Sequence, residues 1–437
     1  MAVFEDDIAW HTERANLYAE LHARPFKIIA SDALISHVAL LCNEAQREQQ
    51  KQQLLTFLQQ RQVDVERIEG SCQVYHTQDL IIRYEQHLEF TSLTITEQRN
   101  NLSQQVPFIQ TALSRLPADW FQHFPGTMIA AFHLHICFEP VADVPKPQIL
   151  KPLFDDKLMI GSWPQQGAAQ VWTNFHTHKD NFGRFLIYNR SMTKGQMGRM
   201  VQRLIEIETY RLMALLGYVE ARALAPDLKE MDATMAKLTE QLASGLGDDD
   251  HVLLKQLTDL ASQIEAHRAR TTFRFNASTA YHEILQARII ELDEDEVSGH
   301  LTIKEFLSRR LTPAVRSCAT VQERLENLSK RVNRASDMLR TRVELALHHQ
   351  NQLLLSSLER RSRIQLAMQH TVEGLSVAAI SYYSVGLFKY LTDALYAAGA
   401  QFNKTAVLGM SVPVIVGAVW YVTHKIHNRF KHMAKKQ

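Results

Sequence analysis

One stretch near the C-terminus constrains this chain more than any other, because nineteen consecutive residues, Thr405–Thr423, carry no charged side chain. At ~1.5 Å per residue, a helix of this length roughly matches the ~30 Å hydrocarbon core of a bilayer. Basic residues follow at once: Lys425, Arg429, Lys431, Lys435 and Lys436. The sequence therefore predicts a water-soluble body that is fixed to a membrane through its C-terminal part.

The overall composition is that of a folded protein of two or three structural units, with 437 residues, 22% charged side chains and a formal charge of +1. This charge gives no electrostatic reason to expect nucleic acid as a partner. The four cysteines form no CxxC pair, which fits a reducing cytosol. The first residues lack a basic region followed by an apolar one, so no secretory signal is expected.

Hydrophobic patterning predicts an α+β fold. Residues 1–192 form a mixed α/β cytosolic domain with one Gln-rich helix, Glu44–Gln62. Its expected strands are Leu34–Leu41, Leu80–Ile95, Met128–Phe138, Gln170–His176 and Arg184–Tyr188. Residues 193–370 are predicted to form a long antiparallel helical stalk, interrupted near 245–247, with its last helix opening at Thr312-Pro313. Residues 371–424 are expected to be a transmembrane hairpin, and residues 425–437 a basic cytoplasmic tail.

The last helix of the stalk carries a heptad pattern. Its apolar positions alternate spacings of four and three, as in a coiled-coil seam: Val321, Leu325, Leu328, Val332, Ala335 and Leu339. The rhythm continues more weakly through Arg342, Ala346, His349 and Leu353. Two interpretations fit equally well: one face of a helical bundle within the chain, or a seam between copies of the chain.

A second apolar stretch, Gly374–Phe388, precedes the first and is predicted to extend to about residue 391 as another span. Because basic residues stay in the cytoplasm, two spans place the body and the tail on the same side of the membrane. The expected location is the inner membrane of a bacterium. Both predicted spans carry small residues four apart, as in membrane helices that pack closely: Gly374 and Ala378, then Gly409, Pro413 and Gly417.

Four short motifs are spread along the sequence: ELHARPF at Glu20–Phe26, YEQHLEFT at Tyr84–Thr91, VQRLIEIETYR at Val201–Arg211 and EGLSVAAISYY at Glu373–Tyr383. These sequence words resemble those of a bacterial family of uncharacterised membrane-anchored proteins. They span most of the chain, and only the second departs from the expected pattern, with Tyr84 in place of Trp. The resemblance implies membrane anchoring and brings no established activity.

The layout of an α/β body, a long helix and two C-terminal spans is also similar to that of CorA-type magnesium channels. Those channels carry a Gly-Met-Asn triplet at the end of the first span. Here that place holds Val385-Gly386-Leu387-Phe388, and the Gly409-Met410 pair is followed by Ser411. A divalent-cation channel or transporter is therefore an alternative that rests on layout alone.

Two polar triplets alternate along predicted strands, so their members would share one face. Glu20, His22 and Arg24 could bind an anionic group, or form salt bridges that fix the N-terminal segment. Glu85, His87 and Glu89 could contribute to a metal site, or pair with basic groups on neighbouring strands.

Histidines form two further sets with the same alternation: His133 with His135, and His176 with His178 and Asp180. If the two strands were adjacent, imidazoles and a carboxylate could hold a divalent metal. The third alternative is therefore a metal-dependent enzyme. The sequence has no P-loop, G-x-G-x-x-G, G-x-S-x-G or H-E-x-x-H motif, so an enzyme is not the first expectation. The first expectation is a membrane-anchored scaffold or interaction protein that forms homo-oligomers.

Overall fold

The computed structural model describes residues 11–14, 17–18, 28–66, 68, 70–100, 102, 105–138, 147–244, 250–399 and 403–434. The chain divides into two compact units, Met1–Ser336 and Asp337–Gln437. The boundary between them falls inside one helix, α8 (Ile303–Ala397). Each unit is described by itself.

The described part of the first unit is built on a nine-stranded mixed sheet with the strand order β2-β3-β4-β1-β5-β8-β7-β6-β9. Strands β5 and β8 run parallel, and the other neighbours pair antiparallel. The strands are β1 (Ala33–Leu41), β2 (Cys72–His76), β3 (Ile81–Gln86), β4 (Phe90–Gln98), β5 (Thr127–Cys137), β6 (Ile160–Trp163), β7 (Ala169–Thr173), β8 (Gly183–Asn189) and β9 (Glu294–Glu296).

The α+β class and the central strands are confirmed, but one predicted strand is wrong. The run Leu80–Ile95 is two strands, β3 and β4, which fold back on each other so that Gln86 pairs with Thr91. Glu85 lies near the end of β3, whereas His87 and Glu89 lie in the connecting turn. The three side chains therefore do not share one face of a strand.

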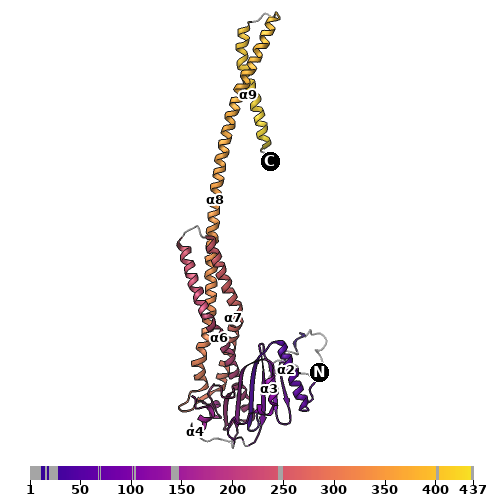
Figure 1. Cartoon of the computed structure of the whole chain (residues 1–437), viewed down its shortest axis with the longest axis vertical. Helices are drawn as coiled ribbons and strands as arrows, with labels where there is room; N and C mark the ends of the chain where they lie inside the picture. The colour runs from indigo at the N-terminus through magenta and orange to yellow at the C-terminus, as the bar shows by residue number, and fades with distance from the viewer. Residues whose placement is uncertain are drawn as a thin grey trace, which may run out of the picture. The chain divides into compact units, whose positions relative to one another are not determined.

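The two faces of the sheet bury separate hydrophobic cores. One face is covered by α6 (Lys194–Ser244), by the end of α7 (Asp250–Leu292) and by the start of α8 (Figure 1). The opposite face is covered by α2 (Glu44–Gln60), by the 3-10 turn η2 (Ala112–Arg115) and by α3 (Ala118–Gln122). A smaller cluster lies under α4 (Pro147–Leu150) and η3 (Lys151–Phe154), near the short α5 (Pro164–Gly167).

Helix α8 begins about two and a half turns before the predicted start. Instead of Thr312-Pro313, the first turn forms at Ile303, where the Glu294 carboxylate accepts hydrogen bonds from the backbone N–H groups of Ile303 and Lys304. The side chain of Thr302 accepts another from Glu305, 3.1 Å away. A carboxylate at a helix N-terminus satisfies unpaired N–H groups and opposes the helix dipole, so a tertiary contact sets this boundary.

The heptad positions from Val321 to Leu339 are all buried within the single chain. Polar contacts hold α8 against both other long helices. Arg324 of α8 forms a 2.6 Å ion pair with Asp232 of α6, and Ser329 of α8 donates to Glu265 of α7 over 3.1 Å. The seam is therefore part of an intramolecular three-helix bundle, which agrees with the first of the two interpretations.

The three helices approach one another closely at Gly217. Its backbone N–H donates to the Ser278 hydroxyl of α7 over 3.1 Å. A Cβ placed on Gly217 would lie 2.3 Å from that oxygen and 3.4 Å from the Cys318 sulfur of α8. Glycine is therefore needed here because of the distance between helices.

The second unit contains the rest of α8 and the helix α9 (Lys404–Ala434), which turns back along the end of α8 (Figure 1). Among the described residues, one helix, Lys404–Ile426, is long and apolar enough to cross a membrane. The second predicted span, which begins at Gly374, is not apolar enough to meet this criterion, because Ser381, Tyr382, Tyr383 and Lys389 lower the hydropathy of the α8 segment.

The helical hairpin of the second unit has an inverted pattern of burial. Among the described residues between Gly374 and Ile426, the buried side chains are small and polar: Ser381, Thr392 and Ser411 are 5%, 3% and 8% exposed. Large apolar side chains of the same hairpin are exposed, among them Met410 at 76% and Val414 at 69%. A protein folded in water buries these residue types in the opposite order.

The close approach of the three helices predicts the effect of a Gly217→Ala variant. Alanine favours an exposed helix by up to ~1 kcal/mol over glycine, but its methyl group would overlap Ser278. Because overpacking costs about 1–3 kcal/mol, we expect net destabilisation and a lower thermal midpoint. Gly386→Ala in α8 is the matched control, since a Cβ there meets nothing within 4 Å. An unchanged midpoint for Gly217→Ala would contradict this packing.

Candidate functional site

Two of the four sequence words meet in space where the β3–β4 hairpin faces α6. A cavity of about 30 Å³ separates them. It is lined from the sheet by His37, Glu85, His87, Phe90 and Ser92, and from the helix by Gln202, Ile205, Glu206, Thr209 and Tyr210. This volume holds one or two water molecules and leaves no room for an organic substrate. We call this region the hairpin crevice.

The sheet side of the hairpin crevice holds a buried ion pair and a buried histidine. Arg83 donates to Glu85 over 2.9 Å, and both side chains are about 6% exposed. His37 contacts the hydroxyl groups of Thr94 and Thr209 through its two ring nitrogens, at 2.8 and 3.2 Å. Burial, together with the charges of His87 and Arg83, lowers the pKa of His37 to about 3. His37 is therefore neutral at physiological pH and ties β1 to β4 and α6.

The turn of the hairpin is held to α7 by a second ion pair. Arg274 donates two hydrogen bonds to the Glu89 carboxylate, at 2.6 and 3.0 Å. This two-pronged geometry is the stronger form of an arginine–carboxylate pair. Burial raises the pKa of the neighbouring Tyr281, and Glu89 raises it further. His87 stacks on Phe90 with the two ring centres 4.1 Å apart.

A row of ion pairs continues this contact between α6 and α7. Arg288 of α7 pairs with Glu206 of α6 and with Glu291, the latter at 2.7 Å. Arg203 of α6 reaches Glu291 at 3.1 Å. These carboxylates are already paired with arginines, so the arrangement differs from a set of unpaired metal ligands. It supports a structural joint between the sheet and the two helices.

His133 and His135 of β5 lie on the opposite face of the sheet, and the four histidines predicted as metal ligands come only partly together. Strands β5 and β8 are parallel neighbours, so His133 lies near the turn that precedes β8, and its Nε2 is 4.0 Å from Asp180. His133 Nδ1 shares a 2.8 Å hydrogen bond with Ser36. His176 and Asp180 are in the β7–β8 connection and not on a strand.

His178 and His135 do not take part in the contact between His133 and Asp180. His178 Nδ1 is 2.9 Å from an oxygen of Asp155, a residue with a left-handed φ of 55°. His135 is 2% exposed, and neither ring nitrogen has a hydrogen-bonding partner among the described residues. Burial lowers the pKa of His133 and His135 to about 4, partly opposed by Asp180 and Asp32. It lowers the pKa of His176 and His178 as well.

No group of three or more His, Cys, Asp or Glu side chains among the described residues could hold a metal ion. The convergence expected for the histidine strands is therefore limited to the contact between His133 and Asp180. Glu20, His22 and Arg24 lie outside the residues that the structure describes, so their predicted role stays a prediction.

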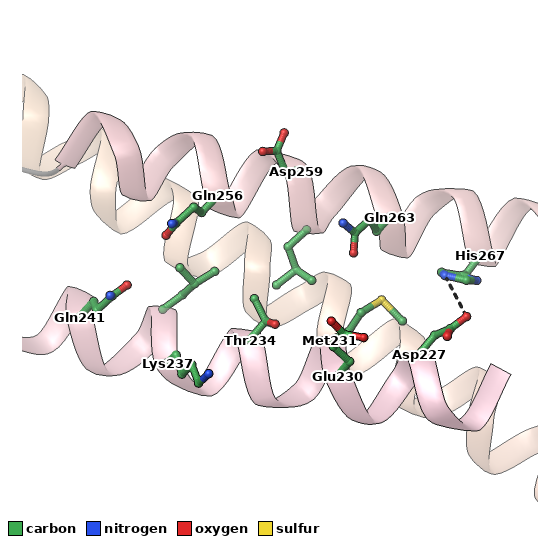
Figure 2. Close-up of a pocket in the computed structure, with 12 residues that line it drawn as sticks. Asp227, Glu230, Met231, Thr234, Lys237, Gln241, Gln256, Asp259, Gln263 and His267 are labelled. Carbon is green, nitrogen blue, oxygen red and sulfur yellow. Dashed lines mark ion pairs between the residues drawn. The ribbon is translucent and has the colours of Figure 1, made fainter.

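A larger hollow, which the sequence did not indicate, lies between α6 and α7 in the distal part of the stalk (Figure 2). Its volume is about 620 Å³. Polar side chains line its walls, including Asp227, Glu230 and Lys237 of α6 and Gln263 of α7. A 3.8 Å ion pair between Asp227 and His267 crosses one end. The heptad pattern of α8 could not reveal this groove, because its lining residues belong to α6 and α7.

The hairpin crevice predicts an energetic coupling between Glu89 and Arg274. Removing the guanidinium with Arg274→Met leaves a mostly buried carboxylate without its main partner, which costs about 1–3 kcal/mol. The double variant Glu89→Gln/Arg274→Met should recover part of this loss in a double-mutant cycle measured by urea unfolding. The exposed pair Arg363–Glu359 is the control and should couple by less than ~1 kcal/mol. Equal couplings for the two pairs would contradict the role of this joint.

Buried neutral histidines predict a loss of stability in acid. The pKa of His135 falls from the ordinary histidine value of 6.5 to about 4 on folding, so between these values the unfolded chain binds the extra proton. The contribution of neutral His135 to the free energy of unfolding is complete above pH 6.5. It is lost as the pH falls towards 4, by up to about 3 kcal/mol. His135→Leu should flatten this part of the pH dependence of the urea midpoint. His348→Leu, at an exposed position, should leave the slope as in the parent chain, and an unchanged slope in His135→Leu would refute the assignment.

Comparison with known families gives one match. The model of a family described as "Protein of unknown function (DUF3422)" matches residues 9–430. No curated protein matches the chain. The family match covers the sheet, the helical stalk and the C-terminal hairpin, and it agrees with the resemblance drawn from the sequence words as far as an uncharacterised family is concerned. The chain belongs to the DUF3422 family.

Proposed function

We propose that the chain is a membrane-anchored protein whose α+β body stays in water and whose C-terminal hairpin, Gly374–Ile426, lies in the bilayer. The observation that carries this proposal is the inverted burial of the hairpin, with serine and threonine inside and large apolar side chains outside. In lipid the outer surface of a helix pair is apolar, while small and hydroxyl-bearing side chains pack between the helices.

In this proposal α9 crosses the membrane and the end of α8 packs beside it as a second, less apolar span. The hydroxyl groups of Thr392 and Ser411 are bonded to backbone carbonyls of their own helices, so they bring few unsatisfied groups into lipid. Lys389 lies near one end of this segment, where its long side chain can extend to the interface. The hairpin returns the chain to the side on which it entered.

We place both the body and the C-terminus on the cytoplasmic side of the cytoplasmic membrane. The support is the run of basic residues after Thr423, because cytoplasmic flanks of spans are enriched in Lys and Arg. A reporter fused to the C-terminus that fluoresces only in the cytoplasm should be bright, and a dark fusion would overturn the two-span arrangement.

Lysine substitution tests the anchoring itself. Met410→Lys/Val414→Lys puts two cations on the exposed face of α9, each costing about 2.5–3.5 kcal/mol at the centre of a span. We expect this variant to be extracted from membranes by alkaline carbonate, whereas the parent chain stays in the pellet. Leu354→Lys/Leu358→Lys is the matched control, since these residues are similarly exposed on α8 outside the hairpin. Extraction of the parent chain by alkaline carbonate would contradict the proposal.

The body is proposed to act as a scaffold that assembles with other copies through the membrane helices. The heptad positions from Val321 to Leu339 are already buried within the chain, so they are not available for this contact. Gly409 and Gly417 of α9 remain open, because a Cβ on either meets nothing within 4 Å. Gly409→Ile/Gly417→Ile should reduce dimer in crosslinking of native membranes, and crosslinking of the parent chain that gives only monomer would contradict self-association.

Nothing on the described residues favours the channel or the metal-dependent enzyme. The hairpin crevice holds only one or two waters, and its carboxylates pair with arginines. The body is therefore proposed to be an interaction module that performs no catalysis, with the hairpin crevice as the joint that fixes the sheet to α6 and α7.

A further inference from the structure

We propose that a second copy of the chain packs in parallel along an exposed apolar stripe of α8. This α8 stripe consists of Val343, Leu347, Leu354, Ile364, Met368 and Val372. The inference rests on the membrane anchoring and self-association proposed above, and it adds a contact surface that precedes the hairpin in the chain.

The α8 stripe continues the spacing of the buried heptad seam. From Leu339, two steps of four residues reach Val343 and Leu347, and steps of three and four then alternate as far as Met368. This alternation keeps the positions on one side of a helix. Between the apolar members, the same rhythm passes through Gln350, Ser357 and Arg361.

The single chain leaves the α8 stripe uncovered. Every residue from Glu344 to Val372 is exposed, and Leu354, Ile364 and Met368 are 59%, 52% and 67% exposed. Most of the stability of a helix in water comes from packing of its apolar face. A long helical segment that exposes such a face therefore needs a partner along it.

Membrane anchoring favours a second copy as that partner. Two chains that enter a bilayer through the same hairpin carry α8 in the same direction, and each residue lies at the same distance from the membrane. Each member of the α8 stripe then faces its own counterpart, so apolar side chains meet apolar side chains. Confinement to one membrane also raises the effective concentration of one copy for the other.

The α8 stripe is large enough for a specific contact. From Val343 to Val372 it is ~44 Å long, and a helix presents a face about 11 Å wide. Two such faces together bury roughly 1,000 Å², which is the lower end for a specific interface. Arg361 meets its counterpart inside the contact, and a single polar position in a coiled-coil core fixes the register at a cost in stability.

Disulfide crosslinking tests the parallel contact. Leu354→Cys and Leu355→Cys are compared in the full chain in native membranes, with Cys42 and Cys72 replaced by serine. Two copies of residue 354 face each other in the proposed contact, whereas residue 355 lies ~100° further round the helix. Since a disulfide needs two Cα atoms about 4.4–6.8 Å apart, we expect covalent dimer about ten times faster from residue 354. Equal rates, or no dimer from residue 354, would overturn the inference.

The buried arginine gives a second test with the opposite sign. Arg361→Leu replaces the polar position by an apolar one, so dimer formation through Leu354→Cys should become about threefold faster. Arg363→Leu is the matched control, because residue 363 lies ~160° from residue 361 around the helix, and it should leave the rate unchanged. A rate that Arg361→Leu does not raise would contradict the place of Arg361 in the contact.

Carbonate extraction of the same variants separates the sources of failure. A chain that resists carbonate but forms no disulfide at residue 354 would overturn this inference and leave the anchoring intact. A chain that carbonate extracts would contradict both. A disulfide from residue 354 to a different protein would assign the α8 stripe to another partner and would also overturn the inference.

Discussion

One continuous helix, α8, carries two opposite patterns of burial, and the rest of the account depends on this contrast. From Ile303 to Leu339, helix α8 buries most of its apolar side chains on one face, as a helix that packs in water does. Beyond Gly374 the buried positions are Ser381 and Thr392, while large apolar side chains are exposed. Apolar burial is worth roughly 25 cal/mol per Å² in water, so a hairpin with this surface is unfavourable there. In lipid the same surface costs nothing, and this reversal carries the proposal of a membrane anchor.

In the body, a different set of interactions fixes the long helices to the sheet. Apolar packing supplies most of the free energy, through the core shared by β1, β5, β8 and α6. The hairpin crevice adds ion pairs that are buried or nearly so, such as Arg83–Glu85 and Glu89–Arg274. Such pairs contribute little net stability, because desolvation offsets their attraction. We infer that their main effect is to fix the register of α6 and α7 against the β3–β4 hairpin, since a shift would leave buried charges without partners.

The sequence predicted the regular parts of the fold. It failed where contacts between residues far apart in the sequence determine the local structure. Period-2 patterning located β1, β5, β7 and β8 because it reflects one local property, which side of a strand is buried. The β3–β4 hairpin was missed, since His87-Leu88-Glu89 contains none of the usual turn residues. The start of α8 was missed because its capping carboxylate, Glu294, comes from another element. The heptad pattern could not separate a bundle from a dimer, as both bury the same positions. The partial meeting of His133 with Asp180 depends on the parallel pairing of β5 and β8, which no local pattern records.

The most direct test of the anchor is a measurement of whether lipid or water surrounds the exposed face of α9. A nitroxide spin label is attached through Val414→Cys in liposome-reconstituted chain in which Cys42 and Cys72 are replaced by serine, with Leu355→Cys on α8 as the reference. The account predicts that the label at 414 collides with dissolved oxygen and is shielded from a water-soluble nickel chelate, while the label at 355 shows the reverse. Equal access of the nickel chelate to both labels would contradict it.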